Sequence, residues 1–187
     1  MGRGTITLPA TRERYGAVAQ ALHWLTALLV LVAFLLSLGG PEARVYAPER
    51  DADRILHESV GLAVLALVIL RLIWRARDRA PEPPPMPRWM RRAAAATHLL
   101  LYLLLLAVPL SAIFGAWAEG HPIEAYVVGP ISPPFAPAHE FGGWLSEAHK
   151  WLVDVIMWVA GLHAAAGLAH HFLLRDKVLT AMLPPWR

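Results

Sequence analysis

Residues 148–174 read AHKWLVDVIMWVAGLHAAAGLAHHFLL, an apolar segment long enough to cross a bilayer that nevertheless carries four histidines. His149 and His163 are 14 residues apart, which on an α-helix is a rotation about 40° short of four full turns and a rise of about 21 Å. Both imidazoles therefore lie on one stripe of the helix, near opposite faces of a membrane. Ionisable side chains inside a membrane are costly and are candidates for function. We expect these two histidines to bind two metal centres placed in series across the membrane.

The composition indicates a membrane protein and excludes several kinds of site. Of the 187 residues 57% are hydrophobic, and apolar runs extend past 18 positions. The absence of cysteine excludes disulfides, cysteine-ligated zinc and iron–sulfur sites, and the attachment motif of c-type haem. The basic residues cluster beside the apolar spans, so the net charge of +3 does not indicate binding of nucleic acid. No nucleotide-binding or hydrolase motif is present.

Four apolar segments predict an all-α membrane protein, a four-transmembrane-helix bundle built from a single integral-membrane domain over residues 1–187. The spans are expected at about residues 17–38, 55–74, 93–118 and 148–174, and Pro109 is expected to kink the third. Residues 75–92 are rich in proline and predict an extended connector. The long segment 119–147 is expected either to be functional or to carry a short surface helix.

Lysine and arginine predict the orientation of the spans. The N-terminal segment, the second loop and the C-terminal tail hold 13 of the 17 basic residues, and the other two loops with their helix ends hold four. Cytoplasmic loops carry the excess of such residues, so both termini are expected to be cytoplasmic. His57 and His149 then lie together near the outer face, whereas His23 and His163 lie together in the inner half.

Each histidine of the last span thus has one partner at its own depth on another helix. Two sites of two imidazoles in a four-helix bundle suit low-spin b-type haem, whose iron takes two axial nitrogens. Gly61 lies four residues after His57, and Gly167 lies four residues after His163, on the same helix faces. These glycines would leave room for a flat macrocycle, or they would simply let helices pack closely.

At this point the sequence resembles a known family, the bacterial four-span cytochrome b561 group. The stretches that carry the resemblance are residues 21–24 (ALHW), 56–61 (LHESVG), 147–150 (EAHK) and 161–171 (GLHAAAGLAHH). The resemblance implies that two haem b groups are ligated by His23, His57, His149 and His163. It also implies a multi-pass protein of the bacterial inner membrane that exchanges electrons with ubiquinone. Some members are regarded as superoxide oxidases, which reduce quinone with electrons from periplasmic superoxide.

Three residues near the inner histidines leave alternatives open. His170 follows His163 by seven residues and lies only about 20° away in rotation, so by depth it could partner His23 equally well. The resemblance, and not the geometry, favours His163. Arg71 is expected either to pair with haem propionates or to extend to the inner interface. His98, on the third span, is expected to be a packing histidine in preference to a cofactor contact.

The outer end leaves further alternatives. Lys150 and Asp154 are expected to form an ion pair within one helix, although a proton path from a quinone through Asp154 is conceivable. His121 and His139 are expected at the surface or beside a quinone or donor site. Lys150, together with Arg50 and Arg54 of the first outer loop, would attract the superoxide anion. Acidic residues are interspersed with these two arginines.

Three functions are compatible with these features. The leading hypothesis is an oxidoreductase, a dihaem cytochrome that transfers electrons between a periplasmic-side donor, superoxide among the candidates, and ubiquinone. The second is a haem-carrying membrane anchor and electron-transfer subunit of a separate dehydrogenase or hydrogenase. The third is a haem-free transporter whose histidines relay protons.

Overall fold

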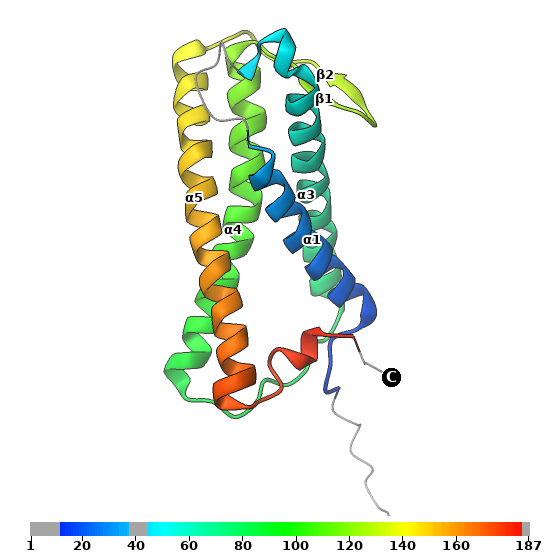
Figure 1. Ribbon diagram of the computed structural model, residues 1–187, viewed down its shortest axis with the longest axis vertical. Helices are drawn as coiled ribbons and strands as arrows, with labels where there is room; N and C mark the ends of the chain where they lie inside the picture. Colours follow the sequence, from blue (N-terminus) through cyan, green and yellow to red (C-terminus); the bar gives the residue numbers. More distant parts are fainter. Residues whose placement is uncertain (1–11, 38–44, 185–187) are drawn as a thin grey trace, which may run out of the picture.

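A computed structural model describes residues 12–37 and 45–184. Four long helices run alternately up and down the molecule (Figure 1): α1 (Ala17–Leu35), α3 (Asp51–Arg77), α4 (Arg88–Glu119) and α5 (His139–Ala169). The shorter elements are the 3₁₀ turn η1 (Pro48–Arg50), the antiparallel strands β1 (Ile123–Ala125) and β2 (Gly129–Ile131), the π-helical turn η2 (His170–Leu174) and the 3₁₀ turn η3 (Thr180–Met182). We call the end that carries β1 and β2 the hairpin end. The opposite end, where α1 begins and η3 lies, is the terminal end.

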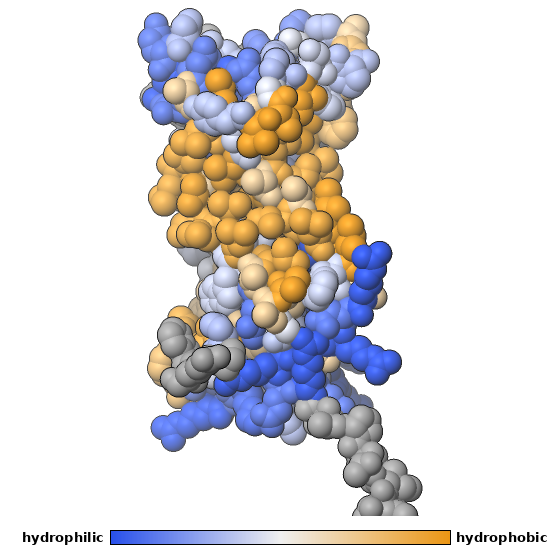
Figure 2. All heavy atoms as spheres, turned by 90° about the vertical axis from the view of Figure 1, so that its right-hand side faces the viewer, coloured by the Kyte–Doolittle hydropathy of each residue, from blue (hydrophilic) through white to orange (hydrophobic). Residues whose placement is uncertain are grey.

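The prediction of an all-α bundle with four spans is confirmed. Within the described residues, four helical segments are long and apolar enough to cross a membrane, namely Ala17–Leu35, Pro48–Arg77, Arg88–Glu119 and His139–Leu174. Large apolar side chains on their outer faces are exposed, among them Leu35, Leu103 and Trp158. Figure 2 shows the result on one face of the molecule, a broad apolar band between two hydrophilic ends. In a lipid solvent such a band needs no further cover.

The helix boundaries differ from the predicted spans mainly at the helix starts. Helix α3 begins at Asp51 and α4 at Arg88, so the extended connector is confined to residues 78–87. Helix α4 stays helical through Pro109. The largest correction concerns α5, which begins at His139 and not near residue 148. Segment 119–147 therefore contains a β-hairpin and the first turns of a spanning helix, and not the short surface helix that was one of the two expectations for it.

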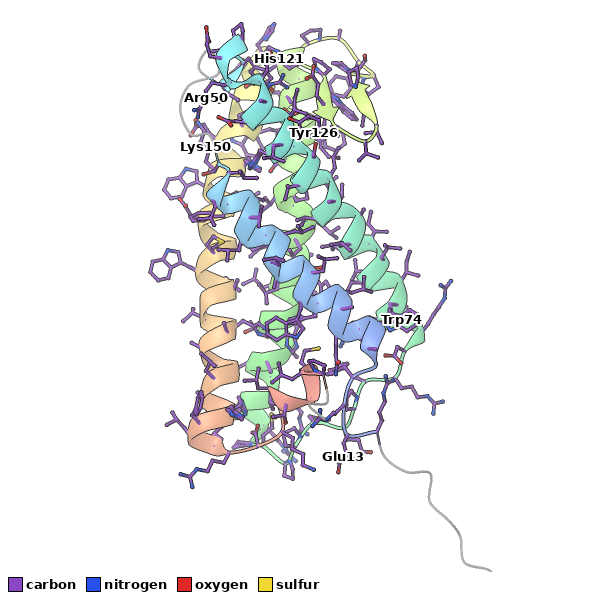
Figure 3. The ribbon with its side chains drawn as sticks, turned by 45° about the vertical axis from the view of Figure 1, so that its right-hand side comes forward. Glu13, Arg50, Trp74, His121, Tyr126 and Lys150 are labelled. Atoms are coloured by element: carbon purple, nitrogen blue, oxygen red, sulfur yellow. The ribbon has the colours of Figure 1, made fainter. Side chains whose placement is uncertain are left out.

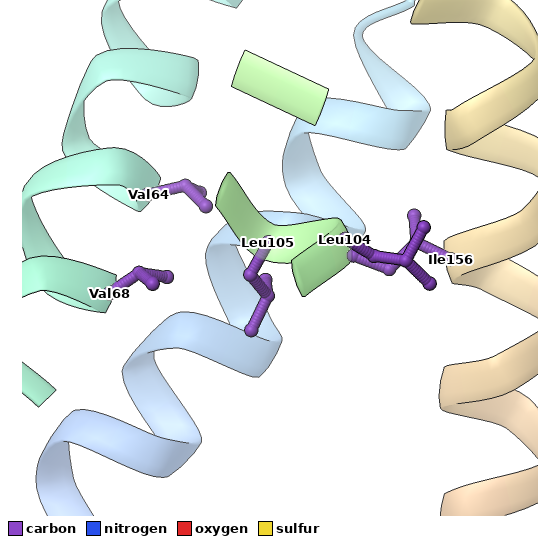
Figure 4. Close-up of a cluster of buried hydrophobic side chains, with 5 residues drawn as sticks. All are labelled: Val64, Val68, Leu104, Leu105 and Ile156. Carbon is purple, nitrogen blue, oxygen red and sulfur yellow. The ribbon is translucent and has the colours of Figure 1, made fainter. Parts of the chain in front are cut away.

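The four helices form two antiparallel pairs. Helix α4 packs along α5, and α1 packs along α3, while α3 also contacts α4. In the described part of the chain, α5 has few close backbone approaches to α1 or α3. The centre of the bundle is filled by the buried side chains Val64, Val68, Leu104, Leu105 and Ile156 (Figure 4). This apolar layer lies about halfway along α5 between His149 and His163.

At the terminal end, the C-terminal segment is held against the start of α1. The amide Nε2 of Gln20, a buried side chain, donates to the backbone carbonyls of Tyr15 (3.0 Å), Ala181 (3.3 Å) and Leu183 (3.1 Å). One helical turn later, Trp24 Nε1 donates to the carbonyl of Met182 at 2.9 Å. These bonds fix α1 on either side of position 23 to the segment around η3.

At the hairpin end, a buried arginine fixes the β-hairpin to the head of α3. Arg54 is 7% exposed, and its guanidinium pairs with Asp51 (3.0 Å), Glu58 (3.2 Å) and Glu124 of β1 (3.2 Å). Glu58 also accepts a hydrogen bond from the backbone N–H of Glu124 at 2.6 Å. The backbone N–H of Tyr126 donates to Ser59 Oγ at 3.1 Å. The hairpin is thereby tied to the residues that flank His57.

Candidate haem sites

The first histidine pair lies near the hairpin end. The rings of His57 on α3 and His149 on α5 have centroids 6.4 Å apart and planes at 88°. Nδ1 of His149 lies 2.9 Å from the backbone carbonyl of Val108 on α4. A carbonyl can only accept, so Nδ1 carries the proton and Nε2 keeps its lone pair. This is the arrangement that orients and polarises a metal-ligating histidine.

A cavity of about 600 Å³ opens beside this first pair. Side chains from all four helices line it, and His57, Gly61 and His149 are among them. Its size is within the range of sites that hold small ligands and cofactors. A Cβ built on Gly61 meets no atom within 4 Å in the described structure. Gly61 therefore does not serve close helix packing, and of the two interpretations the sequence allowed, it fits the one that provides room beside His57.

Nδ1 of His57 is less firmly hydrogen-bonded than Nδ1 of His149. Nδ1 of His57 is buried and has no hydrogen bond of normal geometry within the described residues, although the backbone carbonyl of Ala33 interacts with the ring. Of the two histidines, His149 is thus the more firmly oriented. Burying a ring nitrogen such as Nδ1 of His57 without a strong hydrogen-bond partner costs free energy of folding.

The second histidine pair lies in the terminal half of the bundle. The rings of His23 on α1 and His163 on α5 also have centroids 6.4 Å apart, with planes at 72°. His98 on α4 adds a third ring, 5.3 Å from that of His163. His98, which was expected to be a packing histidine, thus packs its ring beside that of His163. Depth along the third span placed it at this level, but no sequence signal gave its rotation.

Arg71 points into the bundle at this level and does not extend to the interface. Its Nη2 donates to Nδ1 of His23 at 2.8 Å, and its guanidinium lies 5.4 Å from the centroid of the Tyr102 ring. A guanidinium is only a donor, so Nδ1 of His23 accepts and the neutral ring carries its proton on Nε2. Binding of a metal at Nε2 therefore requires Arg71 to release this hydrogen bond.

The structure separates His170 from His163, which rotation alone did not. Nδ1 of His170 lies 2.6 Å from Oδ2 of Asp176, beyond the end of α5. The ring that faces His23 is that of His163. The π-helical turn η2 begins at His170, and the chain turns back at Arg175, whose φ is 54°. The change of helix geometry turns His170 toward the segment that follows.

Arg50 and Lys150 both lie at the hairpin end (Figure 3), and each is paired with a carboxylate. Lys150 binds Glu147 at 2.5 Å, so the expected pairing of Lys150 with Asp154 was wrong. Asp154 lines the cavity. Arg50 approaches Asp53 at 3.5 Å. His121 stacks on Tyr46, a cavity residue, at 3.6 Å between centroids.

The donor set and its spacing fit a haem iron. Among the described residues, no group of three or more histidine, cysteine, aspartate or glutamate side chains could hold a metal ion by itself. A haem iron needs only two protein ligands, because the macrocycle supplies the other four. Two imidazoles bound about 2 Å from one metal, with each centroid about 1.1 Å behind its nitrogen, lie roughly 6 Å apart. Both pairs have this separation.

Comparison with known proteins places the chain in a family. A family model described as prokaryotic cytochrome b561 matches residues 14–185. The chain belongs to the prokaryotic cytochrome b561 family. Members of the family are membrane helical bundles that bind b-type haem, transfer electrons and typically interact with quinones.

Three relatives share nearly the full length of the chain. Cytochrome b561 homolog 2 of Escherichia coli (strain K12) is 33% identical over 92% of this chain and 93% of the relative. The probable superoxide oxidase CybB of Yersinia pestis is 32% identical over 94% of this chain and 98% of the relative. Cytochrome b562 of Cereibacter sphaeroides is 31% identical over 91% of this chain and 96% of the relative. The resemblance drawn from the histidine stretches is thereby confirmed, and this cytochrome b561 family member is a bacterial membrane protein.

Proposed function

We propose that the chain holds two b-type haems, one between His57 and His149 and the other between His23 and His163. In this proposal the protein is a multi-pass protein of the bacterial inner membrane that transfers electrons from a donor at the hairpin end to ubiquinone. The terminal end faces the cytoplasm, because 11 of the 14 lysines and arginines in the described residues lie in the segments of that half and three lie at the hairpin end. The hairpin end then faces the periplasm.

The observation that carries the proposal is the repetition of one geometry at two depths. Each pair joins α5 to a helix of the other antiparallel pair, and each has a centroid separation of 6.4 Å. The two α5 histidines are 14 residues apart, a rise of about 21 Å. At the first pair, the cavity of about 600 Å³ gives room for a flat group beside the two histidines.

The side chains orient the ligands and keep water away from the path between them. A bis-histidine haem carries one electron by cycling between ferric and ferrous iron. The Val108 carbonyl holds His149 in the tautomer that presents Nε2. The apolar layer of Val64, Val68 and their neighbours lies between the two levels. An electron can cross this layer from one haem level to the other, but the layer offers protons and ions no polar route.

Superoxide is the donor that we propose for the hairpin end. The support is the relative from Yersinia pestis, which is named a probable superoxide oxidase. Each superoxide would give up one electron and leave as dioxygen, and two electrons with two protons would convert ubiquinone to ubiquinol. Attraction of the anion does not support this choice, since Arg50, Arg54 and Lys150 are each paired with carboxylates.

A spectrum and three variants test the proposal. A reduced-minus-oxidised spectrum should show b-type bands, with two haems per chain by pyridine haemochrome assay. His149→Ala should lower the content to one haem and remove one component of a redox titration, and His163→Ala should remove the other. His139→Ala is the matched control, because this histidine begins the same helix and is exposed. Two haems retained in His149→Ala would refute the assignment of the first pair.

The purified protein also separates the leading function from that of an anchor subunit. Purified protein alone should reduce ubiquinone with electrons from superoxide in a stopped-flow assay. If the haems are present but electrons enter only when a co-purifying dehydrogenase or hydrogenase is supplied, the chain acts as its membrane anchor. Membership of a haem-binding family argues against the haem-free transporter.

A further inference from the structure

The turn of the β-hairpin exposes three consecutive apolar side chains. Tyr126, Val127 and Val128 join β1 to β2 and are 63%, 94% and 62% exposed. Turns that stand in water are usually built from glycine, proline, asparagine, aspartate and serine. A turn of tyrosine and two valines has no reason to be apolar if water surrounds it.

The hairpin holds this turn in a fixed place beside the head of α3. The hydroxyl of Tyr126 donates to the carbonyl of Ala52 in the first turn of α3 at 3.3 Å. The clamp of Arg54 on Glu124, with the bonds from the hairpin backbone to Glu58 and Ser59, fixes the strands. Ile123 and Ala125 of β1 are buried, so the hairpin packs against the bundle through β1. These contacts hold the strands and Tyr126, the first residue of the turn, against the bundle.

The projection points away from the bundle at the edge of the membrane-facing surface. Figure 1 shows the hairpin leaving the bundle beside α3, with its turn directed outward. Figure 2 views this side and shows apolar surface reaching from the central band into the hairpin end. The backbone N–H of Tyr126 is bonded to Ser59, immediately before the long apolar run of α3 begins at Val60. The turn therefore lies at the depth where the spanning segment meets the water.

We propose that Tyr126, Val127 and Val128 insert into the headgroup–acyl boundary of the leaflet at the hairpin end. Tyrosine is a residue of membrane interfaces because its ring is apolar and its hydroxyl is polar. The two valines would lie in the outermost hydrocarbon, continuous with the apolar band that the lipid already covers. The anchor would hold the head of α3 at a fixed depth, and with it His57. It requires only that the helices cross a membrane, and it does not depend on haem.

Site-directed spin labelling tests this position directly, because the chain contains no cysteine and one introduced thiol is the only thiol. A nitroxide is attached to Val127→Cys in liposomes of phosphatidylcholine and phosphatidylglycerol. Its collision rates with dioxygen and with a water-soluble nickel chelate are measured and compared with those of two control positions. Glu49→Cys, on the exposed turn η1, is the control in water. Leu103→Cys, exposed on the outer face of α4, is the control in lipid.

The label at position 127 should collide more with dioxygen and at least several-fold less with the chelate than the label at position 49. Its ratio of the two rates should lie between those of the two controls. A ratio equal to that at position 49 would overturn the proposal, because the turn would then stand in water. Protection from both reagents would also overturn it, since a protein and not lipid would then cover the turn.

Discussion

The cavity beside His57 provides a sharp test through Gly61. We consider Gly61→Leu, which adds a branched side chain where a Cβ meets no atom within 4 Å. Replacing a glycine inside a helix favours the helix by up to about 1 kcal/mol. The fold is therefore expected to tolerate the change. The added carbons lie one turn from His57 and project into the space lined by both histidines of that pair. Haem content should fall from two to one per chain, with the component at the hairpin end lost.

The assay is haem content per chain together with the thermal unfolding midpoint. Gly142→Ala is the control, because its Cβ would lie 2.6 Å from Cγ and 2.9 Å from the backbone nitrogen of Glu119. Overpacking of that kind costs about 1–3 kcal/mol of stability, without selecting one haem. Two haems retained in Gly61→Leu would refute the assignment of this cavity. Loss of both haems in equal measure would show that the glycine serves the fold.

Two further changes address the terminal end. Arg71→Met removes a cation that reaches His23, so the haem there should become harder to reduce. A guanidinium that stays beside the His23 ring after releasing its hydrogen bond would lie about 7 Å from a metal at Nε2, and at an effective dielectric constant of about 20 their interaction is on the order of 2 kcal/mol. A redox titration measures this effect against the exposed control Arg75→Met. Equal potentials in both variants would contradict this reasoning. Gln20→Ala removes the donor to three backbone carbonyls and should cost about 1–3 kcal/mol of stability in thermal unfolding. The control Thr180→Ala removes one exposed hydrogen bond. If Gln20→Ala lowers the stability no more than this control does, the reasoning is contradicted.

The sequence was sufficient to predict the number of spans and the level of each histidine. Hydropathy reports which segments cross a membrane, and the helical rise converts residue number into depth. Depth alone brought His57 to the level of His149 and His23 to that of His163, and in the structure both pairs of rings face each other. Rotation about a helix axis depends on packing between helices, so neither the position of His98 nor the separation of His170 from the pair could be predicted.

The early start of α5 was missed for a physical reason. Gly142 and Gly143 are poor helix formers, so the sequence of residues 139–147 does not indicate the start of a spanning helix. In the structure, Gly142 lies against the end of α4, where any side chain would meet Glu119. The glycine is needed because two helices approach closely there, and that contact offsets its low helix propensity. The ion pair of Lys150 also differs from the prediction: Lys150 pairs with Glu147, three residues before it, although Asp154, four residues after it, is also within reach on the helix.

The division of the bundle into two antiparallel pairs has a consequence for biogenesis. The partners in each pair, α1 with α3 and α4 with α5, are adjacent in the sequence, so each pair can insert as a helical hairpin during translation. The two helical hairpins are joined by the contact of α3 with α4, by the central apolar layer and by the bonds of the C-terminal segment to α1, and the facing histidines add the places where a cofactor would link them. Supply of the cofactor would then be the last step of assembly. Cells starved of haem are expected to accumulate chains that are inserted in the membrane but lack the links that the cofactors would make between the two halves.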